Sequence, residues 1–322
     1  MEQRRLGRTG LMVSVLGYGC GAIGGLMVRG TPAEQERAIG RALERGVTYF
    51  DTAFAYGDGV SETNLGRALK TLGADPIIGT KVRIYDDGRG DIASGIAASL
   101  TASLKRLGRE RVELFQLHNP ITLHGRAPSF TVAEILEQAV PALQRAQTAG
   151  LIGHYGITGI GDAAALRHVL DDGGFATAQI PFNLLNPSAA AAPPAGMPDL
   201  GRIIDHAAAC DVGVIGIRVL AGGALSGSAA RHPVAAQQVA PIASGASYLA
   251  DVEAARHFLP LVEEGHAANL VEAALRFAIG PAGISLILVG TATGAEFEHA
   301  ADAVDKGPLS AAALARIAVL RH

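Results

Sequence analysis

Short apolar runs alternate with amphipathic stretches along almost the whole chain. The runs VTYFD, PIIGTK and VELFQLH are typical, since each is largely apolar and too short for a helix. Runs of this kind predict strands that are buried on both faces. The stretches between them repeat apolar residues at helical spacing, which predicts a helix after each strand. The expected helices cover residues 32–45, 61–71, 91–107, 131–149, 162–171, 198–210, 251–263, 268–278 and 294–304.

Residues with good capping chemistry stand at the starts of several of these helices. Thr31 is an expected N-cap and Pro32 follows it at the first helical position. Ser61, Asp91 and Thr131 are expected to start the next long helices in the same way. The side-chain oxygen of each would accept one of the backbone N–H groups that a helix leaves unpaired.

Eight strand–helix units are the number that closes a parallel barrel, so we expect one (β/α)8 TIM barrel over residues 1–322. A short hairpin that turns at Thr9-Gly10 is expected to cap it at the N-terminus. A doubly wound open sheet is the competing fold. The stretch GYGCGAIGG after the first strand contains a Gly-x-Gly-x-x-Gly pattern, but no acidic residue sits suitably beyond it for a dinucleotide-binding fingerprint. Long loops follow the fourth, sixth and seventh strands, at 119–130, 184–197 and 220–250. They lie on the face where barrels carry their active sites.

Composition narrows the class of protein. The chain of 322 residues is 49% hydrophobic and 18% charged, which excludes a disordered or fibrous protein. A net charge of −3 gives no electrostatic reason to expect nucleic acid or an anionic membrane as a partner. Cys20 and Cys210 are far apart, as expected for free thiols in a reducing compartment, and no metal-ligand motif is present. With no signal-peptide pattern and no apolar run of 18 residues, we expect a cytoplasmic protein; its oligomeric state is not indicated.

Four polar residues stand at three consecutive strand ends. Asp51 closes the second strand and Tyr56 follows on its loop, while Lys81 and His118 close the third and fourth strands. Adjacent strand ends meet at one rim of a barrel, so these four side chains are expected to meet. Each alone has a simpler explanation, such as a cap or a rim aromatic. A lysine at the end of a buried strand, however, requires a counterion.

Together the four residues suit proton transfer. A phenol has a pKa near ~10, and a lysine ammonium beside it is expected to lower that pKa toward neutral pH. Asp51 would keep Lys81 charged, and His118 would donate a hydrogen bond to a carbonyl oxygen. The set predicts proton donation to a carbonyl while another group delivers hydride.

These residues, in the contexts FDTAFAYG, GTK and LHNP, resemble the catalytic tetrad of the aldo-keto reductases. SETNLGRAL, GHYGIT and AQIPFN add to a resemblance that runs over essentially the whole chain. The resemblance implies a barrel that binds NADP or NAD in extended form and a small carbonyl or sugar substrate. It implies Tyr56 as the general acid/base, Lys81 and Asp51 as the pair that tunes it, and His118 as the residue that orients the carbonyl.

The same resemblance implies a cofactor site, with departures. Gly159 stands where asparagine is usual, and Ile217 stands where the family commonly has an aromatic residue that stacks on nicotinamide. Arg218 beside it is open to another role, such as contact with a phosphate or the substrate. The expected cofactor-binding residues are Gly21, Ala22, Thr158, Gln179, Arg218, Leu220, Gly222, Gly290, Thr291 and Glu296.

The largest departure follows the eighth strand. Members that use NADP typically hold its 2′-phosphate there with Lys or Arg, but residues 281–305 contain neither. Glu296 occupies the approximate position of the family arginine. A carboxylate would repel that phosphate and could accept hydrogen bonds from ribose hydroxyls, which favours NAD or dual use. The alternative is that Glu296 binds no ligand and only interacts favourably with the N-terminus of its helix, where acidic residues are preferred.

The substrate and the direction of the reaction stay open. The expected pocket includes Phe54, Tyr85 and Asn119, together with the long loops. One rival is a non-catalytic barrel that binds cofactor as a sensor or subunit, and another is a Schiff-base aldolase that uses Lys81. A third is oxidation of an aldose at C1 to a lactone, toward which GYGCGAIGG, FDTAFAYGDGVSE and LVGTAT loosely point.

Overall fold

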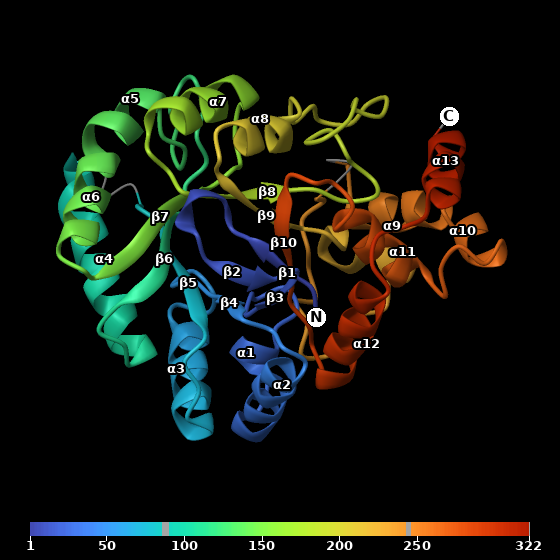
Figure 1. Ribbon diagram of the computed structural model, residues 1–322, viewed down its shortest axis with the longest axis horizontal. Coiled ribbons are helices and arrows are strands. Elements are labelled where there is room, and N and C mark those ends of the chain that lie inside the picture. Colours follow the sequence, from blue (N-terminus) through green and yellow to red (C-terminus); the bar gives the residue numbers. More distant parts are fainter. Residues whose placement is uncertain (86–89, 243–245, 322) are drawn as a thin grey trace.

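The computed structural model describes residues 1–85, 90–242 and 246–321, and eight parallel strands form a closed barrel at its centre (Figure 1). The barrel closes where β10 pairs with β3, Leu288 opposite Gly17, and where β9 pairs with β10 on the other side. The strands are β3 (Leu16–Gly19), β4 (Tyr49–Asp51), β5 (Ile77–Val82), β6 (Val112–Leu117), β7 (Ile152–Thr158), β8 (Thr177–Pro181), β9 (Gly213–Ile217) and β10 (Ile284–Val289). The predicted barrel is confirmed.

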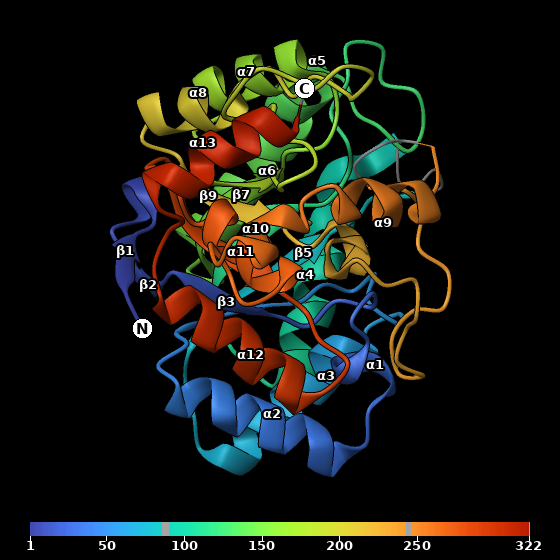
Figure 2. The same ribbon diagram turned by 90° about the vertical axis from the view of Figure 1, so that its right-hand side faces the viewer.

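Helices surround the barrel and bury their apolar faces on the outside of the sheet (Figures 1 and 2). The principal ones are α2 (Pro32–Glu44), α3 (Val60–Leu72), α4 (Ile92–Leu107), α6 (Val140–Thr148), α7 (Ala163–Asp172), α8 (Ile203–Ala209), α9 (Tyr248–Arg256), α11 (Leu270–Ala278), α12 (Gly294–Asp305) and α13 (Ala311–Leu320). Shorter ones are α1 (Leu26–Arg29), α5 (Val132–Glu134) and α10 (Pro260–Glu263). No helix in these described stretches combines the length and apolar character needed to cross a membrane.

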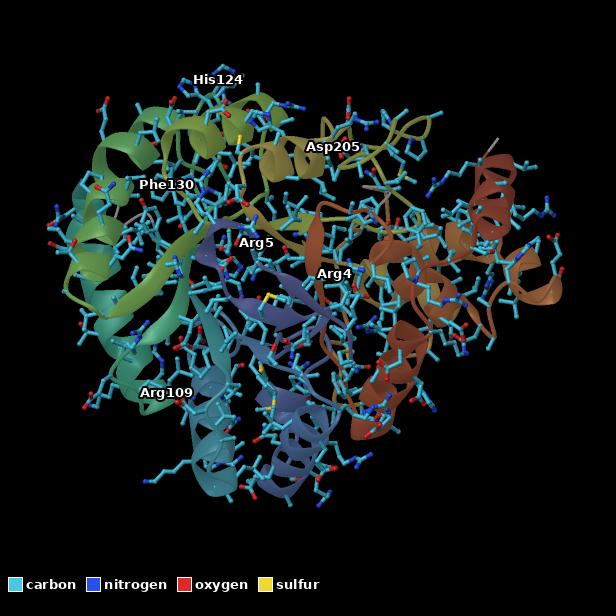
Figure 3. The ribbon with its side chains drawn as sticks, in the orientation of Figure 1. Arg4, Arg5, Arg109, His124, Phe130 and Asp205 are labelled. Atoms are coloured by element: carbon cyan, nitrogen blue, oxygen red, sulfur yellow. The ribbon has the colours of Figure 1, made fainter. Side chains whose placement is uncertain are left out.

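A two-stranded antiparallel sheet closes the end of the barrel where the strands begin. β1 (Gln3–Arg5) pairs with β2 (Met12–Ser14), as the hairpin prediction requires. Arg5 forms an ion pair with Asp211 just before β9, and Arg4 and Arg5 are both visible on this sheet in Figure 3. Leu6 seals the barrel interior together with Tyr49, Leu114, Ile215 and Leu286. Because this end is sealed, the opposite rim, where the strands end, is the one open to a ligand.

Several helix starts and boundaries differ from the sequence predictions. The prediction of Ser61 as a cap is wrong: α3 begins at Val60 after Gly59, and Ser61 is buried with its hydroxyl donating to the carbonyl of Cys20 at 2.9 Å. The caps at Thr31, Asp91 and Thr131 are confirmed.

The helix predicted over 131–149 is interrupted by a π-helical segment, Ile135–Ala139, just before Pro141. Proline lacks the N–H that an unbroken α-helix would need at this place, which accounts for the interruption. The helix predicted at 198–210 begins only at Ile203, and α13 was not predicted. Ala313 and Ile317 of α13 belong, with Leu225, to a second apolar cluster beside the barrel.

Candidate active site

Lys81 lies buried at the end of β5 with every N–H of its ammonium group used. The group donates to the Asp51 carboxylate, to the carbonyl oxygen of Thr52 at 2.8 Å and to the Tyr56 hydroxyl at 3.1 Å. An ammonium group has three N–H donors and no acceptor, so these contacts satisfy it completely. A lysine that is 1% exposed requires such pairing, because an unpaired charge in the interior is very unfavourable. The predicted Asp51–Lys81–Tyr56 cluster is therefore present in the structure.

Asp51 is held by two further donors. Its second carboxylate oxygen accepts from the Tyr49 hydroxyl at 3.1 Å and from the Gln179 amide at 2.5 Å. The role of Tyr49 was missed at the sequence level, where it was read only as an apolar strand residue. Gln179 is expected from the sequence to bind the cofactor, and in the structure its NH2 group holds the Asp51 carboxylate.

Tyr56 is placed by a tight turn between β4 and α3. The turn is closed by the N–H of Gly59, which donates to the carbonyl of Phe54 at 2.7 Å. Gly59 has φ of +89°, and a Cβ there would collide with the Arg106 side chain, so glycine is required. The phenol ring meets the His118 ring edge-on, with 5.9 Å between ring centroids. His118 and Tyr56 thus face the same space.

Burial dominates the protonation equilibria of the cluster. The sequence predicted a lowered pKa for Tyr56, and this is wrong: loss of hydration raises the pKa of Tyr56, and the Lys81 ammonium only partly offsets the rise. Burial by itself lowers the pKa of Lys81, but Asp51 and Tyr56 outweigh it, so the net pKa is raised and the amine stays protonated. Burial also raises the pKa of Asp51, which Lys81 and the two hydrogen-bond donors oppose.

His118 is a neutral imidazole at physiological pH. Burial, followed by the positive charges of Lys81, Arg83 and Arg218, lowers the pKa of His118 to about 3. Its Nδ1 atom is buried without a hydrogen-bond partner among the described residues. Such an imidazole offers an N–H donor to a substrate oxygen without adding a charge.

A cavity of about 890 Å³ opens above the cluster, at the carboxyl ends of the strands. Asp51, Tyr56 and His118 line it, and Lys81 lies beneath them. All ten residues proposed for cofactor binding line the same cavity. They are Gly21, Ala22, Thr158, Gln179, Arg218, Leu220, Gly222, Gly290, Thr291 and Glu296. The structure therefore brings the two candidate sets together.

The cavity walls fit a nucleotide that carries a nicotinamide. A Cβ added to Gly21 would point into the cavity, with the Tyr56 ring as its nearest neighbour at 3.9 Å, so glycine leaves room for a ring beside the phenol. Thr158 is 2% exposed, and its hydroxyl has no partner among the described residues, as expected for a group that binds a ligand amide. Gly222 and Gly223 line the cavity, and both have a positive φ, a conformation that glycine adopts readily.

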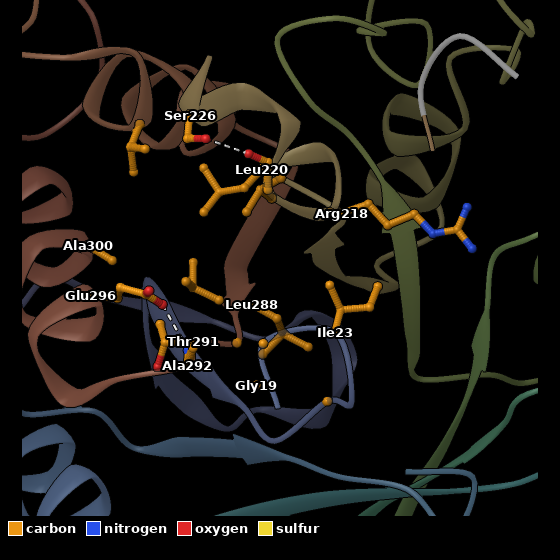
Figure 4. A pocket seen from close by; sticks show the side chains of 18 of the residues that line it. Gly19, Ile23, Arg218, Leu220, Ser226, Leu288, Thr291, Ala292, Glu296 and Ala300 are labelled. Atoms are coloured by element: carbon orange, nitrogen blue, oxygen red, sulfur yellow. Dashed lines mark hydrogen bonds between the residues drawn. The ribbon is translucent and has the colours of Figure 1, made fainter. Parts of the chain in front are cut away.

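Figure 4 shows the opposite side of the cavity, where Glu296 and Ala300 of α12 face the interior. Glu296 accepts the N–H of Ala292 at 2.8 Å with one carboxylate oxygen, which leaves the other for a ligand. Lys306, directly after the stretch 281–305 that contains no Lys or Arg, also lines the cavity, but its ammonium group donates to the Glu272 carboxylate at 2.7 Å. Lys306 was missed because it follows the end of α12.

The loop after β9 returns across the cavity and is fastened on both sides. Arg231 donates to the carbonyl of Gly222 and to the Tyr248 hydroxyl, both at 2.8 Å. Arg29 donates to the carbonyl of Val234 at 2.6 Å, and the N–H of Ala236 donates to the carbonyl of Ile23 at 2.9 Å. Sequence reasoning found the length of this loop but not these two arginines.

The three expected substrate-pocket residues lie outside the lining of this cavity. Asn119 is fully buried, and its amide binds both the N–H and the C=O of Ile84 and the carbonyl of Pro128, so it fixes loops. Phe54 packs against the Arg106 guanidinium, and Tyr85 is exposed with the Arg83 guanidinium over its ring.

A separate cluster of possible metal ligands lies between α7 and α8, where Asp171, His206 and Cys210 have ligand atoms within 4.8 Å of one another. Arg167 approaches His206 Nδ1 at 3.1 Å and can only donate. Nε2 therefore carries the imidazole proton and donates it to Asp171 at 2.8 Å. In this structure the three side chains form a hydrogen-bonded contact between α7 and the C-terminal end of α8.

Comparisons with known proteins agree with this geometry. Residues 15–321 match the model of the aldo/keto reductase family. L-galactose dehydrogenase of Arabidopsis thaliana is 32% identical over 165 residues, which are 50% of this chain and 49% of that protein. D-threo-aldose 1-dehydrogenase of a Pseudomonas species is 29% identical over 185 residues, 50% of this chain and 54% of that protein. The chain thus spans about half the length of these curated relatives in the matched segments.

A solved structure of an aldo-keto reductase from Bacillus halodurans, in its holo form, superposes on this fold with a TM-score of 0.74. The superposition covers 99% of this chain and 96% of that one at 23% sequence identity, and it supports the barrel fold alone. The family match over nearly the whole length is the stronger finding. The chain belongs to the aldo/keto reductase family.

Proposed function

We propose that this protein is a nicotinamide-dependent oxidoreductase that interconverts a carbonyl and an alcohol. The observation that carries the proposal is the set of three contacts made by the Lys81 ammonium. These contacts hold the Tyr56 hydroxyl at the floor of a cavity whose lining fits a nucleotide. A bound nicotinamide would supply or accept the hydride.

The chain's own residues would handle the proton and the carbonyl oxygen. Tyr56 would donate its hydroxyl proton to the oxygen as hydride reaches the carbon, and would take a proton back in the reverse direction. Lys81 would stabilise the tyrosinate through the 3.1 Å contact, while Asp51 keeps the ammonium charged and oriented. Neutral His118 would donate to the same oxygen and align the carbonyl.

Oxidation of an aldose at C1 is a second candidate, in which the same residues work in the opposite direction. Two of the relatives are named L-galactose dehydrogenase and D-threo-aldose 1-dehydrogenase, and their names favour a sugar substrate. An available carboxylate oxygen on Glu296, and the pairing of Lys306 with Glu272, favour NAD or dual cofactor use. NAD use would suit oxidation in cells.

The direct test is turnover of aldehydes with NADH and NADPH, and of aldoses with NAD and NADP, followed through the absorbance of the reduced nicotinamide. Measurable turnover supports the proposal and removes the sensor alternative. The Schiff-base alternative requires a neutral amine, whereas Lys81 is protonated and fully hydrogen-bonded. Trapping of substrate on Lys81 by borohydride would overturn our assignment.

A further inference from the structure

Arg218 lines the cavity and carries a positive charge that no described side chain pairs. It follows directly after β9 and is accessible to solvent. Its guanidinium makes no hydrogen bond or ion pair with any residue of the described ranges. The other arginine of the lining, Arg231, differs because the Gly222 carbonyl, the Ala236 carbonyl and Tyr248 engage its guanidinium.

The backbone presents Arg218 at some conformational cost. Its φ of 59° lies in the left-handed region, which residues with a Cβ rarely adopt and which is often found at binding sites. Its carbonyl accepts from the Ala221 N–H at 2.8 Å and from the Asn183 amide at 3.3 Å. Asn183 is itself buried, and its side-chain oxygen accepts from the N–H groups of Leu185 and Asn186. The loop after β8 thus holds the turn that carries Arg218.

The side chain of Arg218 lies at the catalytic end of the cavity, which is the end lined by Asp51, Tyr56 and His118. In Figure 4 it extends away from Glu296 and Ala300, which lie across the cavity on α12. Its positive charge contributes to the lowered pKa of His118, and Tyr56 is the ionisable group that acts on Arg218 in return. The acidic residues of the lining other than Asp51 are Glu272, Glu296 and Asp302, on α11 and α12. Arg218 therefore lies on the side of the cavity where Tyr56 and His118 would meet a carbonyl group, within the part of the cavity that a substrate would occupy.

We propose that Arg218 selects a carbonyl substrate, or the corresponding alcohol, that carries a carboxylate group. A guanidinium is planar and presents paired N–H donors, which match the two oxygens of a carboxylate in a bidentate contact. A single accessible guanidinium balances the charge of one carboxylate, whereas a phosphate dianion would leave charge uncompensated. This inference rests on the proposed oxidoreductase function and adds a substrate class to it.

The experiment compares 4-oxobutanoate with its neutral amide, 4-oxobutanamide, in the wild type and in Arg218→Gln. The expected wild-type ratio of kcat/KM is at least tenfold in favour of the carboxylate, carried mainly by KM, and Arg218→Gln is expected to bring this ratio close to one. Arg218→Lys should keep only part of the preference, because it retains the charge and loses the paired donors. Arg202→Gln is the control: Arg202 is an exposed arginine paired with Asp205, and its removal changes the net charge equally.

A binding measurement separates this inference from the proposed function. Calorimetric titration with 4-oxobutanoate does not depend on turnover, so an enzyme that binds it through Arg218 without turning it over would support the inference and contradict the function. A ratio near one in the wild type, or an unchanged ratio in Arg218→Gln, would overturn the carboxylate assignment. A second pair of substrates tests for a phosphate instead. If the ratio of kcat/KM for glyceraldehyde 3-phosphate over glyceraldehyde exceeds the ratio for 4-oxobutanoate over its amide, the carboxylate assignment is overturned in favour of a phosphate.

Discussion

The two ends of the cavity are built by different means. At the catalytic end, Asp51, Lys81 and His118 stand at or next to the ends of neighbouring barrel strands, and Tyr56 is fixed by the turn that follows β4. At the other end, which we call the binding end, Glu296 comes from α12 and Lys306 from its C-terminus. The loop after β9 covers the space between the two ends. Barrel closure dictates the first arrangement, whereas loop and helix-end chemistry decides the second. The first end should therefore govern the chemical step, and the second should govern which cofactor binds.

Replacement of Tyr56 by Phe should give the largest effect. The ring and its contact with His118 would remain, but the proton donor would be lost, so we expect kcat to fall by about 10²–10⁴-fold. Cofactor affinity, measured by titration with NADH or NADPH and the fluorescence of the reduced nicotinamide, should change by less than about twofold because no cofactor-binding group is removed. An equal loss of cofactor affinity would instead assign Tyr56 to the binding end.

Replacement of Lys81 by Met should stop turnover and also destabilise the fold. Removal of one partner from a buried ion pair typically costs about 3–5 kcal/mol, because the remaining charge is left unpaired. Urea denaturation should show this fall in the free energy of unfolding.

The double variant Lys81→Met with Asp51→Asn should recover part of that stability, since no buried charge remains. It should not recover turnover. If the single variant were as stable as the wild type, Asp51 would not be a buried carboxylate that depends on Lys81.

His118 should make stability depend on pH in the acid range. Its folded pKa of about 3 lies below the unfolded value near ~6.5, so between these values the unfolded state binds more protons. Its contribution is therefore fully present above about pH 6.5 and is lost as the pH falls, by up to about 1.4 kcal/mol per pH unit. His118→Gln should flatten the dependence between pH 4 and 6, whereas His168→Gln on the exposed face of α7 should not.

Replacement of Glu296 by Gln should give the smallest effect, confined to the binding end. The amide can still accept from Ala292 but no longer repels a phosphate, so the affinity ratio of NADPH to NADH should rise by about three- to tenfold. Glu298→Gln is the matched control on the same helix, because Glu298 binds Arg41 and Arg45 outside the cavity. If NADPH already binds much more tightly in the wild type, the interpretation of Glu296 is wrong.

The sequence was sufficient for the barrel and for the strand ends of the catalytic end. Alternation of apolar runs and helical stretches fixes the order of strands, and closure then brings Asp51, Lys81 and His118 together. The contact between Tyr49 and Asp51 depends on which strand residues face the interior, which the apolar run VTYFD does not reveal. The raised pKa of Tyr56 depends on burial, which follows only from the folded cavity.

The loops were less predictable for a related reason. The position of Asn119 directly after His118 predicts a pocket residue, but the chain folds back so that the Asn119 amide donates to the carbonyls of Ile84 and Pro128. Arg29 and Arg231 act through distant backbone carbonyls, which have no side-chain signature in the sequence. Contacts of this kind are fixed by loop conformation rather than by periodicity.

Deuterium transfer from the reduced nicotinamide tests the central proposal most directly. NADH and NADPH labelled at the transferring C4 position are mixed with an aldehyde in wild type and Tyr56→Phe, and the product alcohol is analysed by mass spectrometry. We expect the wild type to form product that carries one deuterium per molecule. Tyr56→Phe, with cofactor still bound, should form this product at no more than about one hundredth of the wild-type rate. Product that forms without deuterium, or at the same rate in both proteins, would contradict hydride transfer assisted by Tyr56.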